Sequence, residues 1–438
     1  MQKKIKIFLF FICLQISSYV LSNEIENQIE PEPFSMIQKS ERNNLRFKNF
    51  IVISANDYAT KVGYEILKKG GNAADAAVGI QLTLGLVEPQ SSGLGGGIFL
   101  TYYDSNTKKI LSYEGREKAP QALNEKIFLD SNNKPKKFFD AVLGGKSVGV
   151  PALLKTMFLF HQKYGTLKWK EIIKPVISIA DEGFIPPNRL KNALKKEKYL
   201  FQLYPNSIFK NIKKNPNSIF KNKDYAETLR IVSKNYNSFY EGEIAKNIVK
   251  TVGSSINPGN LELPDLKNYN PEIRQSFCAR LNSGYKICGP NLPSSGTICV
   301  IQALTLIEEL YKKNLSTKKN LEEILEILDF IYFLRDKDLA DDKFINVNLD
   351  ELLDLNILKK KFNFFKEKKK KASEIYNLNE IFNSTTHYSI VDRNRNVISA
   401  TSSIESSFGS RLFVNGFFLN NQLTDFSFSI TDKFGNKN

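Results

Sequence analysis

The sequence has few of the side chains that most often bind metals or activate nucleophiles. Its 438 residues include two histidines and four cysteines, and these do not have the spacing of a zinc site. No recognisable nucleic-acid-binding motif is present. The glycine-rich run at residues 93–97 lacks the Gly-Lys-Ser/Thr of a phosphate loop and precedes an expected strand, whereas a phosphate loop precedes a helix. These absences argue against a zinc protein, a nucleotide-binding protein and a nucleic-acid-binding protein.

Long apolar runs are also scarce, and the clearest one lies at the N-terminus. Residues 7–20 are mostly apolar and follow Lys3, Lys4 and Lys6. The run is short for a membrane span, and residues of small or modest size follow it. We therefore expect a cleaved signal peptide over residues 1–22, with the mature chain in the periplasm or secreted. An uncleaved membrane anchor is the alternative.

The formal net charge is +16, although the hydrophobic and charged fractions are those of an ordinary soluble globular protein. Many of the lysines are scattered among asparagines, which is typical of solvated surface. Attraction to an anionic envelope surface is the weaker alternative. The most basic stretch, residues 359–371, is interpreted as the start of a flexible linker that runs to residue 384.

Three cysteines remain after the expected removal of the signal peptide: Cys278, Cys288 and Cys299. Residues 273–281 and 285–288 are β-rich and flank an Asn-Ser-Gly turn, which predicts a hairpin. Its register places Cys278 opposite Cys288, and an oxidising compartment favours a disulfide between them. Facing Cβ atoms in such pairs are roughly 4.5 to 5.5 Å apart, so closure needs local adjustment. Three free thiols are the alternative.

Helical and strand patterns predict the secondary structure of several segments between Asn56 and residue 310. A helix is predicted from Asn56 or Asp57 to Gly70, and residues 73–87 are apolar nearly all round, which indicates a buried helix. Strands are predicted at 98–103 and 110–113 as a hairpin. Helices are also expected at 152–164, 169–183 and 300–310.

Two further features of the middle region have structural interpretations. His161 lies on the first of the mid-chain helices, among apolar residues, and is interpreted as structure. Residues 205–210 and 216–221 both read Pro-Asn-Ser-Ile-Phe-Lys. We interpret this local duplication as a surface insertion, because two copies of six residues cannot form a solenoid.

The most informative stretch begins at Thr385 and Thr386. Residues 388–391 and 397–401 have strand character and flank a polar tract, which predicts a hairpin with the two threonines at the start of its first strand. Threonine is common in strands, so this position alone indicates packing. A threonine at a chain end is different, because its α-amine, with a reference pKa of about 7.7 to 8.0, can act as base for its own hydroxyl.

Several motifs resemble the γ-glutamyltranspeptidase family, and the resemblance extends from about Asn56 to Phe426. It implies an α+β fold, the αββα sandwich of an N-terminal nucleophile hydrolase, in which two sheets lie between helical layers. It also implies an enzyme with no metal or organic cofactor. The segments that carry the resemblance are residues 70–77, 89–97, 115–120, 385–392, 406–410 and 419–426.

The resemblance implies self-cleavage between Ser384 and Thr385, which divides the chain into a large subunit, 23–384, and a small-subunit region, 385–438. Before cleavage the Thr385 nitrogen is an amide and cannot act as a base. The hydroxyl must therefore attack the Ser384 carbonyl, and water then releases the acyl group. By the same resemblance Thr401 and Ser403 lie beside the nucleophile, and Ser403 can hold its amine.

The resemblance also implies the substrate contacts. Arg116 binds the α-carboxylate of a γ-glutamyl group, as suits a guanidinium that presents two donors. Asp425 binds the α-ammonium, Gln422 supplies a second polar contact, and Glu405 stands where some members carry asparagine. The implied reaction transfers the γ-glutamyl group of glutathione, or of another γ-glutamyl compound, to water or to an amino acid or dipeptide.

The family continues for well over a hundred residues beyond Asn438, so we expect a C-terminally truncated chain. The family's paired serines and paired glycines, which hold the substrate carboxylate and form the oxyanion hole, are not in this sequence. Loss of one oxyanion donor typically slows a reaction about 10²- to 10³-fold. Two alternatives therefore remain: an inactive proenzyme or remnant that binds γ-glutamyl peptides, and a related amidase that acts on another acyl group, such as a β-lactam side chain. Arg116 and Asp425 favour the glutamyl substrate.

Overall fold

A six-stranded antiparallel sheet forms the centre of the molecule in the computed structural model, which describes residues 47–312, 317–371 and 385–431. Its strand order is β1-β7-β8-β2-β3-β4, so the strand that starts at Thr385 lies beside the first strand of the described chain. The hairpins predicted from strands at 98–103 and 110–113 and from strands at 388–391 and 397–401 are confirmed, with some strands longer than predicted, and they are neighbours through the pairing of β8 with β2. The strands are β1 (Ile51–Ser54), β2 (Gly97–Tyr103), β3 (Ile110–Gly115), β4 (Glu272–Gln275), β7 (Thr385–Val391) and β8 (Val397–Ser403).

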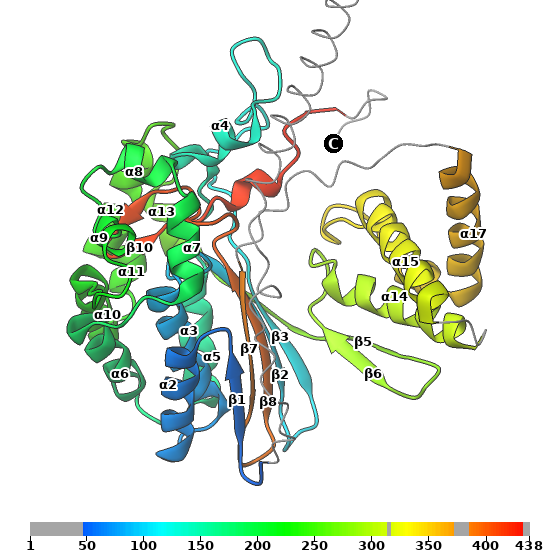
Figure 1. Cartoon of the computed structure of the whole chain (residues 1–438), viewed down its shortest axis with the longest axis horizontal. Helices are drawn as coiled ribbons and strands as arrows, with labels where there is room; N and C mark the ends of the chain where they lie inside the picture. Colours follow the sequence, from blue (N-terminus) through cyan, green and yellow to red (C-terminus); the bar gives the residue numbers. More distant parts are fainter. Residues whose placement is uncertain (1–46, 313–316, 372–384, 432–438) are drawn as a thin grey trace, which may run out of the picture.

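Helices cover one face of this sheet (Figure 1). The predicted helices α2 (Asp57–Lys68) and α3 (Ala73–Val87) begin at the caps Asn56 and Asn72. Every residue of α3 is buried, because α2, α5 (Leu153–Tyr164) and α6 (Trp169–Glu182) pack around it as well as the sheet. The predicted buried helix is therefore the centre of the core.

The other helices of this body form an outer layer and the connections. These are α4 (Phe138–Val142), η2 (Gly145–Ser147), α7 (Asn188–Lys196), α8 (Tyr199–Leu203), α9 (Lys210–Lys214), α10 (Lys223–Lys234), α11 (Ser238–Glu241), α12 (Glu243–Gly253) and α13 (Leu263–Asn268). The chain after β8 adds β9 (Phe413–Val414), β10 (Phe417–Phe418) and η3 (Gln422–Asp425).

The opposite face of the sheet carries exposed side chains. Ile53 is 59% exposed, and His387, which lies on the same face of the sheet, is exposed as well. The described residues thus contribute one large sheet and one helical side to the expected αββα arrangement. In the part of the chain that the structure describes, no helix is both long and apolar enough to cross a membrane.

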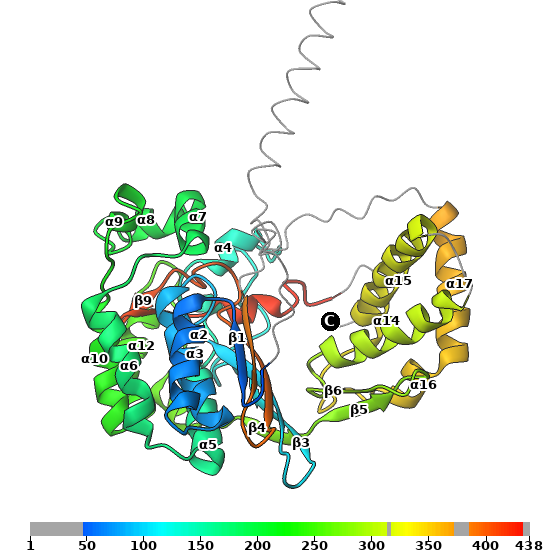
Figure 2. The ribbon, with the colours of Figure 1, turned by 60° about the horizontal axis from the view of Figure 1, so that its bottom comes forward.

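A second group of helices lies apart from the sheet's helical layers (Figure 2). It has its own apolar cluster, which includes Phe330 and Phe362. The interpretation of residues 359–371 as flexible linker was wrong, because they form the end of α17. Leu358, Phe362 and Phe365 repeat at helical spacing and pack in the cluster, while Lys359 pairs with Glu309. The helices are α14 (Gly296–Tyr311), α15 (Thr317–Asp338), α16 (Leu349–Leu353) and α17 (Leu355–Lys371).

The cysteine hairpin joins this second group to the sheet. Strand β5 (Phe277–Arg280) pairs with β6 (Lys286–Gly289) in the predicted register, and a disulfide links Cys278 to Cys288. The single long strand expected from residue 273 is broken at Ser276, whose buried hydroxyl lies 2.7 Å from that of Ser112. Cys299 is free and half-buried.

The interpretation of the duplicated segments as a surface insertion was also wrong in part. Ile208 and Ile219 are exposed, but Phe209 and Phe220 lie in the main core with their ring centroids 5.3 Å apart. The two copies therefore fold so that their phenylalanines meet. His161 is buried structure as expected, since its Nε2 lies 3.1 Å from the Asp75 carboxylate.

Candidate active site

Thr385 is the first residue of β7 and lies opposite Ser403 on β8. The two hydroxyl oxygens are 3.2 Å apart. The Glu405 backbone amide donates to the Ser403 hydroxyl at 2.9 Å, which holds that side chain in place. Since a hydroxyl has one hydrogen and two lone pairs, Ser403 can still exchange a hydrogen bond with Thr385. The ladder thus positions a threonine hydroxyl beside a hydroxyl that can orient it.

Thr401 lies two pairs further along the same ladder. It faces His387 rather than Thr385, and its hydroxyl lies 2.8 Å from His387 Nδ1. His387 is exposed as a residue, but the protein around its ring partly removes it from water, and this desolvation lowers the pKa of His387 and favours the neutral ring. The expected place of Thr401 along the strand beside the nucleophile is therefore correct, but its hydroxyl contacts the histidine.

A second cluster brings together the four residues that the sequence assigned to the substrate. Arg116 follows the end of β3, and its Nη2 lies 2.5 Å from Asp425 Oδ2. The Gln422 amide donates to the same Asp425 oxygen at 2.6 Å and to Glu405 Oε2 at 3.1 Å. Arg116 and Asp425 are 41% and 45% exposed, so a ligand can reach the two groups of opposite charge.

Glu405 connects this cluster to the nucleophile. Its amide binds Ser403 while its carboxylate accepts from Gln422. The residue has φ of 75°, a left-handed conformation that costs a non-glycine residue on the order of 1 kcal/mol or more. This turn allows one residue to contact both parts of the site. The result is a continuous series of hydrogen bonds: Thr385, Ser403, Glu405, Gln422, Asp425, Arg116.

The acidic side chains near Arg116 have raised pKa values. Burial and, to a smaller extent, the nearby charge of Asp425 raise the pKa of Glu405 to about 7, against the opposing effect of Arg116. Glu117 is more deeply buried, and burial raises its pKa to about 8. Its Oε1 has no hydrogen-bond partner among the described residues.

Glu117 was not predicted from the sequence as a site residue. The available signal was its place directly after Arg116, but its burial follows from the approach of Gly97 and Gly149. A Cβ at Gly97 would lie 2.3 Å from Glu117 Oε2, and one at Gly149 would lie 3.0 Å from the Glu117 Cβ. Glycine at both positions therefore makes room for this carboxyl group.

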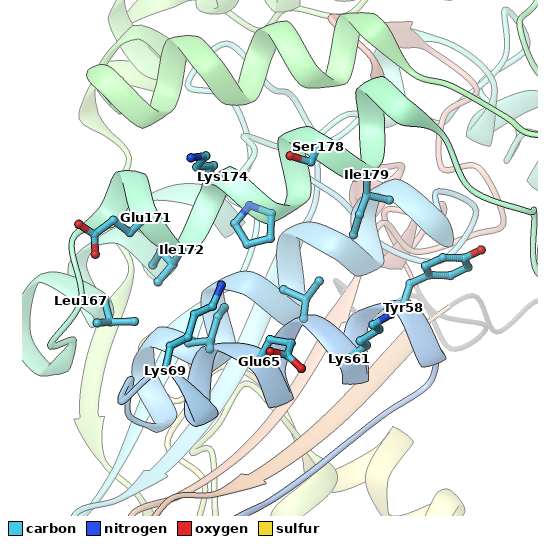
Figure 3. Close-up of a pocket in the computed structure, with 13 residues that line it drawn as sticks. Tyr58, Lys61, Glu65, Lys69, Leu167, Glu171, Ile172, Lys174, Ser178 and Ile179 are labelled. Atoms are coloured by element: carbon cyan, nitrogen blue, oxygen red, sulfur yellow. The ribbon is translucent and has the colours of Figure 1, made fainter.

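A surface groove lies elsewhere on the molecule. It has a volume of about 640 Å³ and runs between α2 and α6, with Lys61, Glu65 and Lys174 at its rim and Ile172 and Ile179 lining it (Figure 3). Neither Thr385 nor the substrate cluster lines it, so the groove is not the candidate site. Within the described ranges, no three His, Cys, Asp or Glu side chains are placed to share a metal ion.

The fold and the threonine at the start of an internal strand define the class of protein, an N-terminal nucleophile hydrolase. A solved cephalosporin acylase from Bacillus halodurans superimposes with a TM-score of 0.72 over 91% of this chain and 74% of that one, at 22% identity. That likeness shows the fold.

The family follows from closer relatives. A family model described as gamma-glutamyltranspeptidase matches residues 59–438, and the chain belongs to this family. It is 33% identical over 407 residues to the glutathione hydrolase proenzyme of Bacillus subtilis strain 168, which covers 86% of this chain and 68% of that protein. The crystal structure of Helicobacter pylori gamma-glutamyltranspeptidase superimposes with a TM-score of 0.66 at 28% identity, over 73% of this chain and 93% of that one.

Proposed function

We propose that this enzyme transfers γ-glutamyl groups from glutathione and related compounds to water or to an amino acid or dipeptide, through an acyl-enzyme on Thr385. The observation that carries the proposal is the hydrogen-bonded series from Thr385 to Arg116. It places a hydroxyl nucleophile close to paired groups of opposite charge. A γ-glutamyl compound has the complementary features, an acyl carbon at one end and a zwitterionic amino acid at the other.

Maturation is the first reaction of the Thr385 hydroxyl. Its oxygen attacks the carbonyl carbon of Ser384, the C–N bond breaks, and the nitrogen takes the proton to become the Thr385 amine. Water then cleaves the ester that has formed. This sequence creates a base where an amide stood, so the α-amine can accept the hydroxyl proton in the later turnover. Ser384 itself lies outside the described residues.

Substrate binding exchanges one ion pair for two. In the described structure Arg116 and Asp425 neutralise each other. The α-carboxylate of the substrate takes Arg116 as partner, and the α-ammonium takes Asp425 and Glu405, with Gln422 holding both acids in place. In the free enzyme Arg116 and Asp425 are therefore paired with each other, and the zwitterionic substrate replaces this one ion pair with two.

Turnover repeats the acyl transfer on the substrate. The Thr385 oxygen attacks the γ-carbonyl carbon, the α-amine takes the hydroxyl proton, and that proton passes to the departing amine as the amide bond breaks. Water or an acceptor amine then attacks the acyl-enzyme by the reverse path. Ser403 orients the Thr385 oxygen in both halves of the reaction.

We also propose that residues 1–22 direct the chain to the periplasm or outside the cell, and that cleavage yields two subunits from one precursor. Residues 1–46 and 372–384 lie outside the described residues. N-terminal sequencing of protein recovered from the periplasm and the medium tests both statements. A new N-terminus near residue 23 and a second at Thr385 would support them.

The decisive experiment compares the intact mass of the wild type with that of Thr385→Ala. Cleavage between Ser384 and Thr385 in the wild type alone supports the nucleophile. A panel of amide substrates then distinguishes the acyl group: γ-glutamyl amides should be hydrolysed, and analogues without the α-amine or α-carboxylate should not. Preference for an acyl group without either charge would contradict the proposed substrate and favour a related amidase.

A further inference from the structure

The start of β7 extends beyond the strand next to it. Strand β1 pairs only with the part of β7 from Tyr388 onward, so Thr385 lies three residues past the end of that pairing. At this end Arg189, from the first turn of α7, donates from Nη2 to the carbonyl oxygen of Thr385 at 3.1 Å. A side chain therefore fixes the backbone of the nucleophile where the neighbouring strand has ended.

Arg189 is itself held by a buried acid. Its Nη1 donates to Glu88 Oε2 at 2.9 Å, and the Glu88 side chain is 1% exposed. The other Glu88 oxygen accepts from Asn56, two residues after the end of β1, at 3.2 Å. Burial raises the pKa of Glu88, and the Arg189 charge opposes that rise. The guanidinium fork thus reaches a carboxylate with one nitrogen and the Thr385 carbonyl with the other, which a lysine cannot reproduce.

We infer that Arg189, clamped by Glu88, is a positioning residue for the Thr385 nucleophile. The inference rests on the proposed function, in which Thr385 becomes a chain end. New chain ends fray unless they are tied down, and the amine and hydroxyl of one residue must keep their geometry for proton transfer. By holding the Thr385 carbonyl, Arg189 fixes the Cα from which both groups extend.

The clamp also has an electrostatic effect. The guanidinium is a cation beside the residue whose α-amine must be neutral to act as a base, and a nearby cation lowers the pKa of an amine. Glu88 partly cancels that effect. Changes at the two residues should therefore move the pKa of the Thr385 amine in opposite directions, whereas a purely structural ion pair would leave it unchanged.

The test uses Arg189→Met, Arg189→Lys and Glu88→Gln in the full chain, with self-cleavage, kcat, KM and the acid limb of the kcat–pH profile as readouts. In Arg189→Met we expect kcat to fall by about 10- to 100-fold, as small misplacements of reacting groups do, with KM within about twofold. Its acid limb should move to higher pH. Arg189→Lys should return the limb toward its wild-type position with a partial recovery of kcat. Glu88→Gln should move the limb to lower pH.

Arg280→Met is the matched control, because Arg280 also donates to a backbone carbonyl, that of Gly284, at 2.9 Å in the distant β5–β6 hairpin. It should leave all four readouts unchanged. Melting temperatures identify variants that lose activity by unfolding, and Arg189→Lys and Glu88→Gln still test the inference if Arg189→Met does not fold.

The outcomes separate the clamp from the proposed function. An active wild type with Arg189 and Glu88 variants that melt earlier but keep kcat and the pH limb would make the pair purely structural and overturn the clamp. A change in KM alone would also overturn it. A wild type indistinguishable from Thr385→Ala would instead refute the function of Thr385, and the clamp with it.

Discussion

The two ends of the candidate site differ in how they are built. The nucleophile end consists of the uncharged side chains of Thr385 and Ser403 on adjacent strands, held by the sheet register. The binding end consists of charged side chains on a strand end and a 3-10 helix, and Arg116 and Asp425 there are partly exposed. This contrast separates the roles: changes at the first end should alter the chemical step, and changes at the second should alter affinity and its pH dependence.

The largest effect that tests this contrast comes from Asp425→Asn. A hydrogen bond to a charged group contributes about 1.5 to 3 kcal/mol, so kcat/KM for a γ-glutamyl amide should fall about 10- to 150-fold, mainly through KM. Self-cleavage should continue, because it uses no α-ammonium. Steady-state kinetics and intact mass measure both. Asp140→Asn, at an exposed position of α4, is the control. A variant that no longer cleaves itself would show that the two ends are not separable.

The pH dependence of binding is the next test. The pKa of Glu405 is raised to about 7, so its carboxylate is protonated below that pH and cannot pair with the substrate ammonium. Arg116, Asp425 and Gln422 face it and set this value together with burial. The inhibition constant of glutamate should therefore fall by up to about tenfold per pH unit as the pH rises from 6 toward 7, and it should become constant above about pH 8. Glu405→Gln should make this dependence flat. An unchanged slope in the variant would assign the titration to another group.

Glu117 should affect the pH dependence of stability. Its pKa is raised from 4.5 to about 8, so the folded protein favours the protonated form. Stability associated with this group is complete below its unfolded pKa and is lost as pH rises from about 4.5 through 8, with a slope of at most about 1.4 kcal/mol per pH unit. Urea unfolding at pH 5 and pH 8 should show that the free energy of unfolding of the wild type falls relative to that of Glu117→Gln as the pH rises. Parallel curves would mean that the acid is ionised in the folded protein.

Local patterns allowed much of the fold to be predicted. The cap at Asn56 or Asp57, the apolar α3 and the hairpin of residues 388–391 and 397–401 depend on residues close in sequence; Asn56 is the cap, and the helix and the hairpin are confirmed. The misreading of 359–371 came from weighing composition above periodicity, since Phe362 and Phe365 already indicated a helix with an apolar face.

Less of the candidate site could be predicted from the sequence, because its contacts join residues that are far apart in the chain. Arg189 and Thr385 are 196 positions apart, and no local pattern indicates that an arginine on α7 reaches the first residue of β7. The place of Glu117 beside Arg116 was visible in the sequence. Its raised pKa was not, because that depends on burial against glycines from two other segments.

The smallest effect on activity should come from the disulfide hairpin, which contributes no residue to the candidate site. Closing a loop of about ten residues constrains the unfolded chain and stabilises the fold by roughly 2 to 3 kcal/mol. Cys278→Ser with Cys288→Ser should therefore lower the melting temperature while kcat and KM stay within about twofold, because β5 and β6 form a separate two-stranded sheet that packs against α14. In the mature wild type, denatured without reductant, thiol titration should find Cys299 alone. A large loss of turnover in the double variant would show that the disulfide hairpin affects the active site. Effects on stability and on activity could then no longer be assigned to different regions of the molecule.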